Sequence, residues 1–107
     1  MRVNLLRETK QVLMEHGLSP EDVLWVGQPE RNLKCNWAGF AKQANFIYDN
    51  SYGSAEIPED LVVVGKDWWL ERYEYDGAEW WEFKRIPEEP KGELLNERLY
   101  LPGHTQG

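Results

Sequence analysis

The stretch WWLERYEYDGAEWWEF, residues 68–83, constrains the fold of this chain more than any other. Its centre is Asp76–Gly77, a pair that readily adopts positive backbone φ angles and therefore favours a two-residue turn between antiparallel strands. Aromatic and other strand-favouring residues dominate both flanks. The stretch predicts a β-hairpin whose strands cover residues 68–75 and 79–86.

A two-residue turn would pair Tyr75 with Ala78 and would sort the aromatic side chains onto two faces. One face would carry Trp68, Leu70, Trp81 and Phe83, and the other would carry Trp69, Tyr73, Tyr75 and Trp80. The same register places Glu71 opposite Glu82, which is unfavourable, so a three-residue loop that shifts the pairing by one residue stays open. The sequence does not decide which face is core and which is exposed.

The first half of the chain predicts two helices. Over residues 4–16, one side of a helix carries apolar residues such as Leu5 and Val12, and Gly17 would end that helix. Asn36 can cap a second helix, along which residues recur at helical spacing. The members of that series are Trp37, Phe40, Ala41 and Ala44.

Short strands and turns are predicted between these helices and the hairpin. Residues 19–22 have the composition of a capped turn, and they lead into an apolar, β-favouring run at 23–26. A short strand is expected at 33–35. Residues 46–60 predict an ordered loop, and the β-branched run at 61–64 predicts a central strand covered on both faces.

Together these elements predict an α+β fold in which two helices pack on a small antiparallel sheet of three to five strands, with a C-terminal β-hairpin. Residues 1–90 are expected to form a single compact domain. Residues 91–107 are expected to form a C-terminal tail that lies on the surface or is partly disordered. The only candidate anchors of that tail are Leu94, Leu95, Leu99 and Tyr100.

Length and cysteine content indicate the class of protein. A chain of 107 residues with one cysteine, Cys35, can bury a modest core but cannot form an intramolecular disulfide. The N-terminus MRVNLLRETK is charged too early for a secretory signal, and no apolar run reaches the ~20 residues that span a bilayer. We therefore expect a soluble protein in a reducing cytoplasm. Its oligomeric state stays open.

Net charge is −7, and the acidic residues gather in the aromatic half of the chain. Residues 54–97 contain thirteen acidic and five basic residues, a local net charge of −8. Direct nucleic-acid binding is disfavoured, because such binders need a basic stripe that contacts phosphates. We expect the partner to offer a basic protein surface rather than nucleic acid or a membrane.

The hairpin supplies the candidate site. An exposed aromatic patch ringed by carboxylates suits a basic surface, since Arg and Lys stack on rings and pair with acids. The predicted partner-binding residues are Trp69, Glu71, Tyr73, Glu74, Tyr75, Asp76, Glu79, Trp80 and Glu82. No activity is expected to accompany this binding.

Catalytic and metal-binding patterns are weak throughout the sequence. His16 and His104 have no ligand-spaced partner, so no metal or other cofactor is expected. Cys35 is expected to be a buried structural thiol. Glu71 and Glu82 could imitate a glycosidase pair beside sugar-binding tryptophans, so a carbohydrate-binding or small hydrolytic module is the alternative. A phage structural component is a further one.

The run LVVVGKDWWLERYEYDGAEWWEF, with DVLWVG upstream and YDNSYG between, resembles a pattern in small uncharacterised proteins of phages and mobile elements from Firmicutes and related gut bacteria. The resemblance spans most of residues 5–87. It differs in the WW before LER, where the familiar pattern has fewer aromatics, and it carries no catalytic residues. It implies an accessory protein that binds and inhibits or modulates a host protein, as anti-CRISPR proteins do with a defence nuclease.

Overall fold

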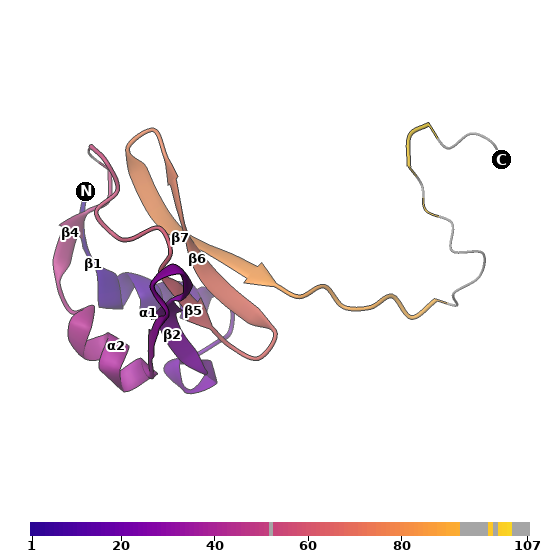
Figure 1. Ribbon diagram of the computed structural model, residues 1–107, viewed down its shortest axis with the longest axis horizontal. Helices are drawn as coiled ribbons and strands as arrows, with labels where there is room; N and C mark the ends of the chain where they lie inside the picture. The colour runs from indigo at the N-terminus through magenta and orange to yellow at the C-terminus, as the bar shows by residue number, and fades with distance from the viewer. Residues whose placement is uncertain (52, 93–98, 100, 104–107) are drawn as a thin grey trace.

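The computed structural model describes residues 1–51, 53–92, 99 and 101–103, and within them the chain has the predicted α+β fold (Figure 1). Five antiparallel strands form the main sheet in the order β3-β2-β5-β6-β7, and β1 and β4 form a separate pair. The elements are β1 (Arg2–Asn4), α1 (Leu5–Glu15), η1 (Pro20–Asp22), β2 (Trp25–Gln28), η2 (Pro29–Arg31), β3 (Leu33–Cys35), α2 (Trp37–Gln43), β4 (Ile47–Asp49), β5 (Val62–Val64), β6 (Trp68–Tyr75) and β7 (Ala78–Arg85).

Side-chain caps set the ends of α1 and α2. The Asn4 carboxamide oxygen accepts a hydrogen bond from the Arg7 amide at 3.0 Å, and the Asn36 carboxamide does the same for the Gly39 amide at 2.8 Å. At its other end, α1 runs into Gly17, whose φ of 72° lets the chain turn back. Both predicted helices are therefore confirmed, each with slightly tighter bounds.

Strands β1, β2 and β4 differ from the sequence prediction, which has no strand before the first helix. The run expected at 23–26 begins two residues later, because the amide of Val23 is used to close η1 on the Pro20 carbonyl. Residues 47–49, predicted as loop, pair with β1 instead. The partner of residues 47–49 lies more than forty residues away, so no local pattern indicates the pairing.

The hairpin has the two-residue turn. Tyr75 is opposite Ala78, and the pairing continues without a break to Trp68 opposite Arg85. Asp76 and Gly77 have φ angles of 51° and 87°, as this class of turn requires. The three-residue loop is therefore wrong, and Glu71 does lie opposite Glu82. The central position of the expected strand is confirmed, since β5 lies between β2 and β6, but its coverage on both faces is wrong: Val63 is buried, whereas Val62 and Val64 are only half-buried.

The helices cover one face of the main sheet. The buried side chains of the helices pack against the strand residues that point toward this face. The loop after β4 contributes Ile57 to the same core. Among the described glycines, Gly65 is packed most closely, since a Cβ atom there would lie 2.1 Å from the Trp68 ring. The buried core consists of Leu5, Leu13, Val26, Phe40, Ala44, Tyr48, Ile57, Val63, Trp68, Leu70 and Trp81.

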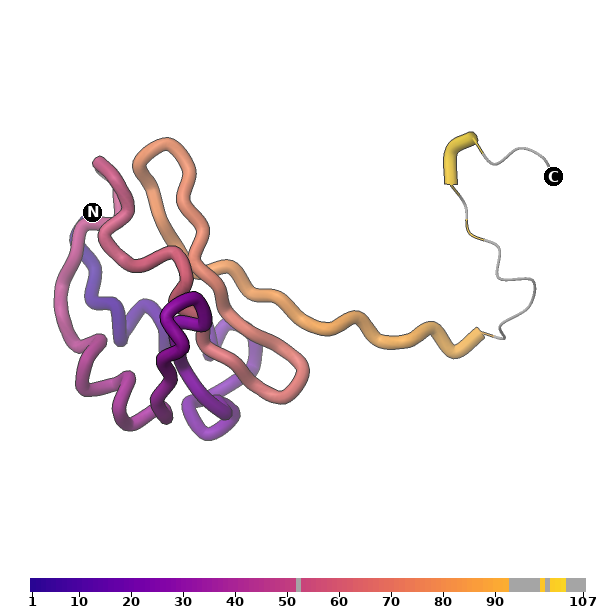
Figure 2. Tube along the Cα trace, viewed as in Figure 1, coloured from indigo at the N-terminus to yellow at the C-terminus, as the bar shows by residue number. Residues whose placement is uncertain are grey.

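The chain leaves the domain after β7, as Figures 1 and 2 show. Residues 87–92 are exposed throughout. Of the four predicted tail anchors, Leu99 is 70% exposed and does not act as one. Leu94, Leu95 and Tyr100 lie outside the described residues.

Candidate functional site

The face of the main sheet that points away from the helices has no covering element among the described residues. Strand alternation places one residue in two on it, and these residues are half-buried or exposed. We call this surface the open face. Its members are Trp25, Val62, Val64, Trp69, Glu71, Tyr73, Tyr75, Ala78, Trp80, Glu82 and Lys84.

Aromatic rings form two groups on the open face. Tyr73 and Trp80 are cross-strand partners whose ring centroids lie 5.3 Å apart. Trp69 aligns with Val64 of β5 and, beyond it, with Trp25 of β2. Tyr73 is 49% exposed, so the first group offers aromatic surface to a partner.

Two carboxylates lie between the aromatic groups. Glu71 and Glu82 occupy directly opposite positions on β6 and β7. The Trp69 indole donates a hydrogen bond to Glu71 at 2.7 Å, and the Trp80 indole donates one to Glu82 at 2.9 Å. Lys84 lies 3.7 Å from Glu82 on the same strand. Each indole bond holds its carboxylate along its own strand, with Glu71 directed toward Trp69 and Glu82 toward Trp80, although the two residues occupy opposite positions.

Six of the nine predicted partner-binding residues belong to the open face. They are Trp69, Glu71, Tyr73, Tyr75, Trp80 and Glu82. Asp76 lies at the exposed tip of the hairpin, and Glu74 is exposed but belongs to the opposite side of β6. The predicted division of the hairpin into two aromatic faces agrees with this arrangement.

Glu79 corrects the prediction, because it is 3% exposed and faces the core. Its carboxylate accepts hydrogen bonds from the backbone amides of Glu56 and Ile57, and it pairs with Arg72 at 3.0 Å. A carboxylate with these partners holds the loop after β4 against the hairpin. It is not available to another protein.

Arg72 is the centre of a buried polar cluster that the sequence prediction missed. Its guanidinium donates to Glu79 and to the Tyr48 hydroxyl, both at 3.0 Å, and lies 3.7 Å from Glu8 of α1. The same group stacks over the Trp81 ring at 4.7 Å. The cluster joins α1, β4, β6 and β7. Alternation along the hairpin could have indicated it, since Arg72 and Glu79 both fall on the face of Trp68 and Trp81.

The surroundings of the cluster change the proton affinities of two of its members. Burial raises the pKa of Glu8 above its ordinary value, although the hydrogen bond from Tyr48 and the charge of Arg72 act in the opposite direction. Burial, together with the bond to Glu8, also raises the pKa of Tyr48. Tyr48 therefore stays a neutral hydrogen-bond donor at physiological pH.

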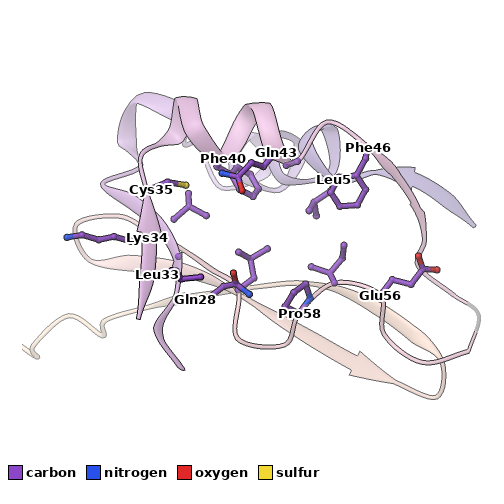
Figure 3. A pocket seen from close by; sticks show the side chains of 15 residues that line it. Leu5, Gln28, Leu33, Lys34, Cys35, Phe40, Gln43, Phe46, Glu56 and Pro58 are labelled. Atoms are coloured by element: carbon purple, nitrogen blue, oxygen red, sulfur yellow. The ribbon is translucent and has the colours of Figure 1, made fainter. Parts of the chain in front are cut away.

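A pocket of about 430 Å³ lies on the helix side of the sheet. Figure 3 shows Phe40 and Gln43 on one side of it and Glu56 and Pro58 on the other. The lining is mainly apolar, and the Gln43 amide is already bonded to the Gly39 carbonyl. Cys35 also lines this pocket and is half-buried, so it is less enclosed than predicted.

Comparisons with known proteins find no matching family model, no matching curated protein and no matching solved structure. Over residues 1–51, 53–92, 99 and 101–103, no helix has the length and apolarity that crossing a membrane requires. Within the same ranges, no three histidine, cysteine, aspartate or glutamate side chains are grouped so that they could hold a metal ion.

Proposed function

We propose that this protein is a non-catalytic interaction protein that binds a basic surface of another protein through the open face. The observation that carries this proposal is the paired Glu71 and Glu82 carboxylates, each held by a tryptophan indole. A guanidinium or ammonium group of the partner would lie over these two carboxylates. The neighbouring rings of Trp69 and Trp80 would flank it.

Electrostatics favours a cation at this position. Like charges at opposite positions of a strand pair are unfavourable, and Lys84 lies beside Glu82, so a cation of the partner would act mainly on Glu71. Arginine suits the site best, because its planar guanidinium can donate to two carboxylate oxygens and can stack on aromatic rings. Each such ring contact contributes ~0.5–2 kcal/mol, depending on how far it is desolvated.

The exposed rings would extend the contact beyond the single cation. Tyr73 and Tyr75 are 49% and 70% exposed, and tyrosine is frequent among the residues that dominate protein interfaces. The acidic residues of the hairpin tip would attract a basic partner before contact. With the resemblance noted in the sequence, we propose a host or element-encoded protein, such as a defence nuclease, as a partner that is inhibited or modulated.

A short arginine-rich peptide and its citrulline counterpart test the chemistry of the site. Citrulline keeps the shape of arginine and removes its charge, so only the arginine peptide should change the tryptophan fluorescence on titration. Glu71→Gln should weaken binding about tenfold, because a hydrogen bond to a charged group contributes ~1.5 kcal/mol. Glu88→Gln is the matched control, since it removes one carboxylate from an exposed residue outside the open face.

Equal binding of the two peptides would contradict the proposal, and so would equal losses of peptide affinity in Glu71→Gln and Glu88→Gln.

The carbohydrate-binding alternative is tested by a separate titration. If a neutral oligosaccharide changes the fluorescence of the protein and Trp80→Ala abolishes that change while the arginine peptide has no effect, the open face is a sugar platform.

A further inference from the structure

Strand β7 leaves part of its backbone without a partner at the edge of the main sheet. It is the last strand in the sheet order, with β6 on one side only. Hydrogen-bonding groups of successive residues in a strand point alternately to the two sides. The amide of Glu79 points away from β6, because it donates to the Asn50 carbonyl at 2.8 Å. The amide of Ile86 points the other way, since it donates to the Asp67 carbonyl.

The alternation therefore directs the backbone groups of Trp81, Phe83 and Arg85 outward. Among the described residues, none pairs with these outward groups. The free segment has a definite limit at each end. Asn50 occupies the edge at Glu79, and Pro87 has no amide hydrogen to donate. Phe83 is the midpoint between these two limits.

We propose that two copies of this chain associate through antiparallel pairing of their β7 strands, with Phe83 opposite Phe83 of the second copy. Trp81 would then lie opposite Arg85 of the second copy, and the outward groups of all three residues would be bonded. The limit at Glu79 coincides with the limit at Pro87 of the second copy. The unpaired segments of the two copies therefore overlap over their whole length.

Charge selects this register over its neighbours. The proposed pairing places Glu82 opposite Lys84 of the second copy, on the open face and at a non-hydrogen-bonded position, where side chains lie closest. A shift to either adjacent allowed register would place Glu82 opposite Glu82 or Lys84 opposite Lys84. The proposed register has two opposite-charge pairs, whereas each alternative has a like-charge pair.

Apolar contact supports the same register. It brings Ile86, which is 57% exposed, opposite Trp80 of the second copy. A long unpaired edge strand is a template for indiscriminate pairing, and edge lysines oppose such pairing. Lys84 therefore opposes pairing of β7 with unrelated strands. It favours pairing with a second copy, because Glu82 of that copy lies opposite it. The pairing does not rest on the proposed function.

Charge variants measured by analytical ultracentrifugation over a wide concentration range test the proposal. The unaltered protein should sediment as a monomer–dimer equilibrium. Glu82→Lys and Lys84→Glu each place two like-charge pairs in the dimer, and each should weaken it at least tenfold. The double variant with both changes restores the opposite-charge pairs and should return the dimer affinity to near its original value. Circular dichroism melts check that each variant folds.

A second pair of variants tests the backbone bonds. Arg85→Pro removes one outward amide from each copy and should weaken the dimer, whereas Arg85→Ala keeps the amide and should retain it. A protein that stays monomeric at every concentration would overturn the proposal. So would a dimer that survives both single charge changes, or a double variant that fails to recover.

Discussion

Arg72 is a residue at which four elements of the domain meet. Its side chain is 3% exposed, and its guanidinium contacts groups from α1, β4 and β7. Removing one partner of a buried ion pair leaves the other charge without compensation, which costs ~3–5 kcal/mol. Arg72→Met should therefore lower the free energy of unfolding by about 3 kcal/mol or more.

Urea denaturation measures that loss, with Arg85→Met as the control. Both variants remove one arginine from the hairpin, but Arg85 is exposed. If the two variants lose the same small amount of stability, the buried cluster does not hold the elements together.

Glu8 should make the free energy of unfolding decrease as pH rises above about 4.5. Its pKa is raised in the folded protein above the ordinary value of 4.5, so the folded state binds more protons than the unfolded state as pH rises from about 4.5 to the folded pKa. The contribution of Glu8 to stability therefore falls as pH rises through that window. Glu8→Gln cannot ionise, so its stability relative to the unaltered protein should increase over the same window.

Urea denaturation at a series of pH values between acid and neutral measures this difference. Glu15→Gln is the matched control, because Glu15 is an exposed carboxylate on the same helix. A difference between Glu8→Gln and the unaltered protein that stays constant with pH would show that Glu8 does not titrate as inferred.

At the scale of the elements, the stability of the hairpin depends on the two turn residues, Asp76 and Gly77. Gly77 has a φ of 87°, where side chains with a Cβ atom are strained, and the nearest atom to an added Cβ would lie 3.6 Å away. Space is therefore sufficient, and the cost of Gly77→Ala should be conformational, at ~1–2 kcal/mol. Thermal denaturation should show that loss for Gly77→Ala and little change for Asp76→Asn, since asparagine also accepts a positive φ. A neutral Gly77→Ala would contradict this account of the turn.

The hairpin and both helices could be predicted because their signals are local. Asp76–Gly77 determines the register of sixteen neighbouring residues, and Asn36 caps a helix that begins at the next residue. Strand β4 could not be predicted, since residues 47–49 become a strand only by pairing with β1 near the N-terminus. Alternation places Glu79 on the face of Trp68 and Trp81, but which face of the hairpin is core depends on contacts from distant segments. The amides that donate to Glu79 belong to Glu56 and Ile57, which lie in a loop whose path no local pattern indicates.

At the scale of the whole molecule, charge and aromatic surface should control different steps of binding. The net charge of −7 attracts a basic partner over a distance of ~10 Å at moderate salt, and this attraction acts on association. Contacts of buried rings act on dissociation. Glu74 and Asp76 are exposed acids near the hairpin tip, whereas Trp80 contributes ring surface to the open face.

Glu74→Lys should therefore slow association with the arginine-rich peptide and reduce its dependence on salt, while leaving dissociation nearly unchanged. Trp80→Ala should do the reverse, because it removes ring contact without changing charge. Stopped-flow fluorescence at several salt concentrations separates the two rates, and Glu21→Lys is the control for a charge reversal at an exposed position in η1, away from the hairpin. Equal effects of Glu74→Lys and Glu21→Lys would mean that net charge alone steers binding. If neither variant slows association, the acidic residues do not steer the partner, and the role of the open face reduces to its rings and the Glu71–Glu82 pair.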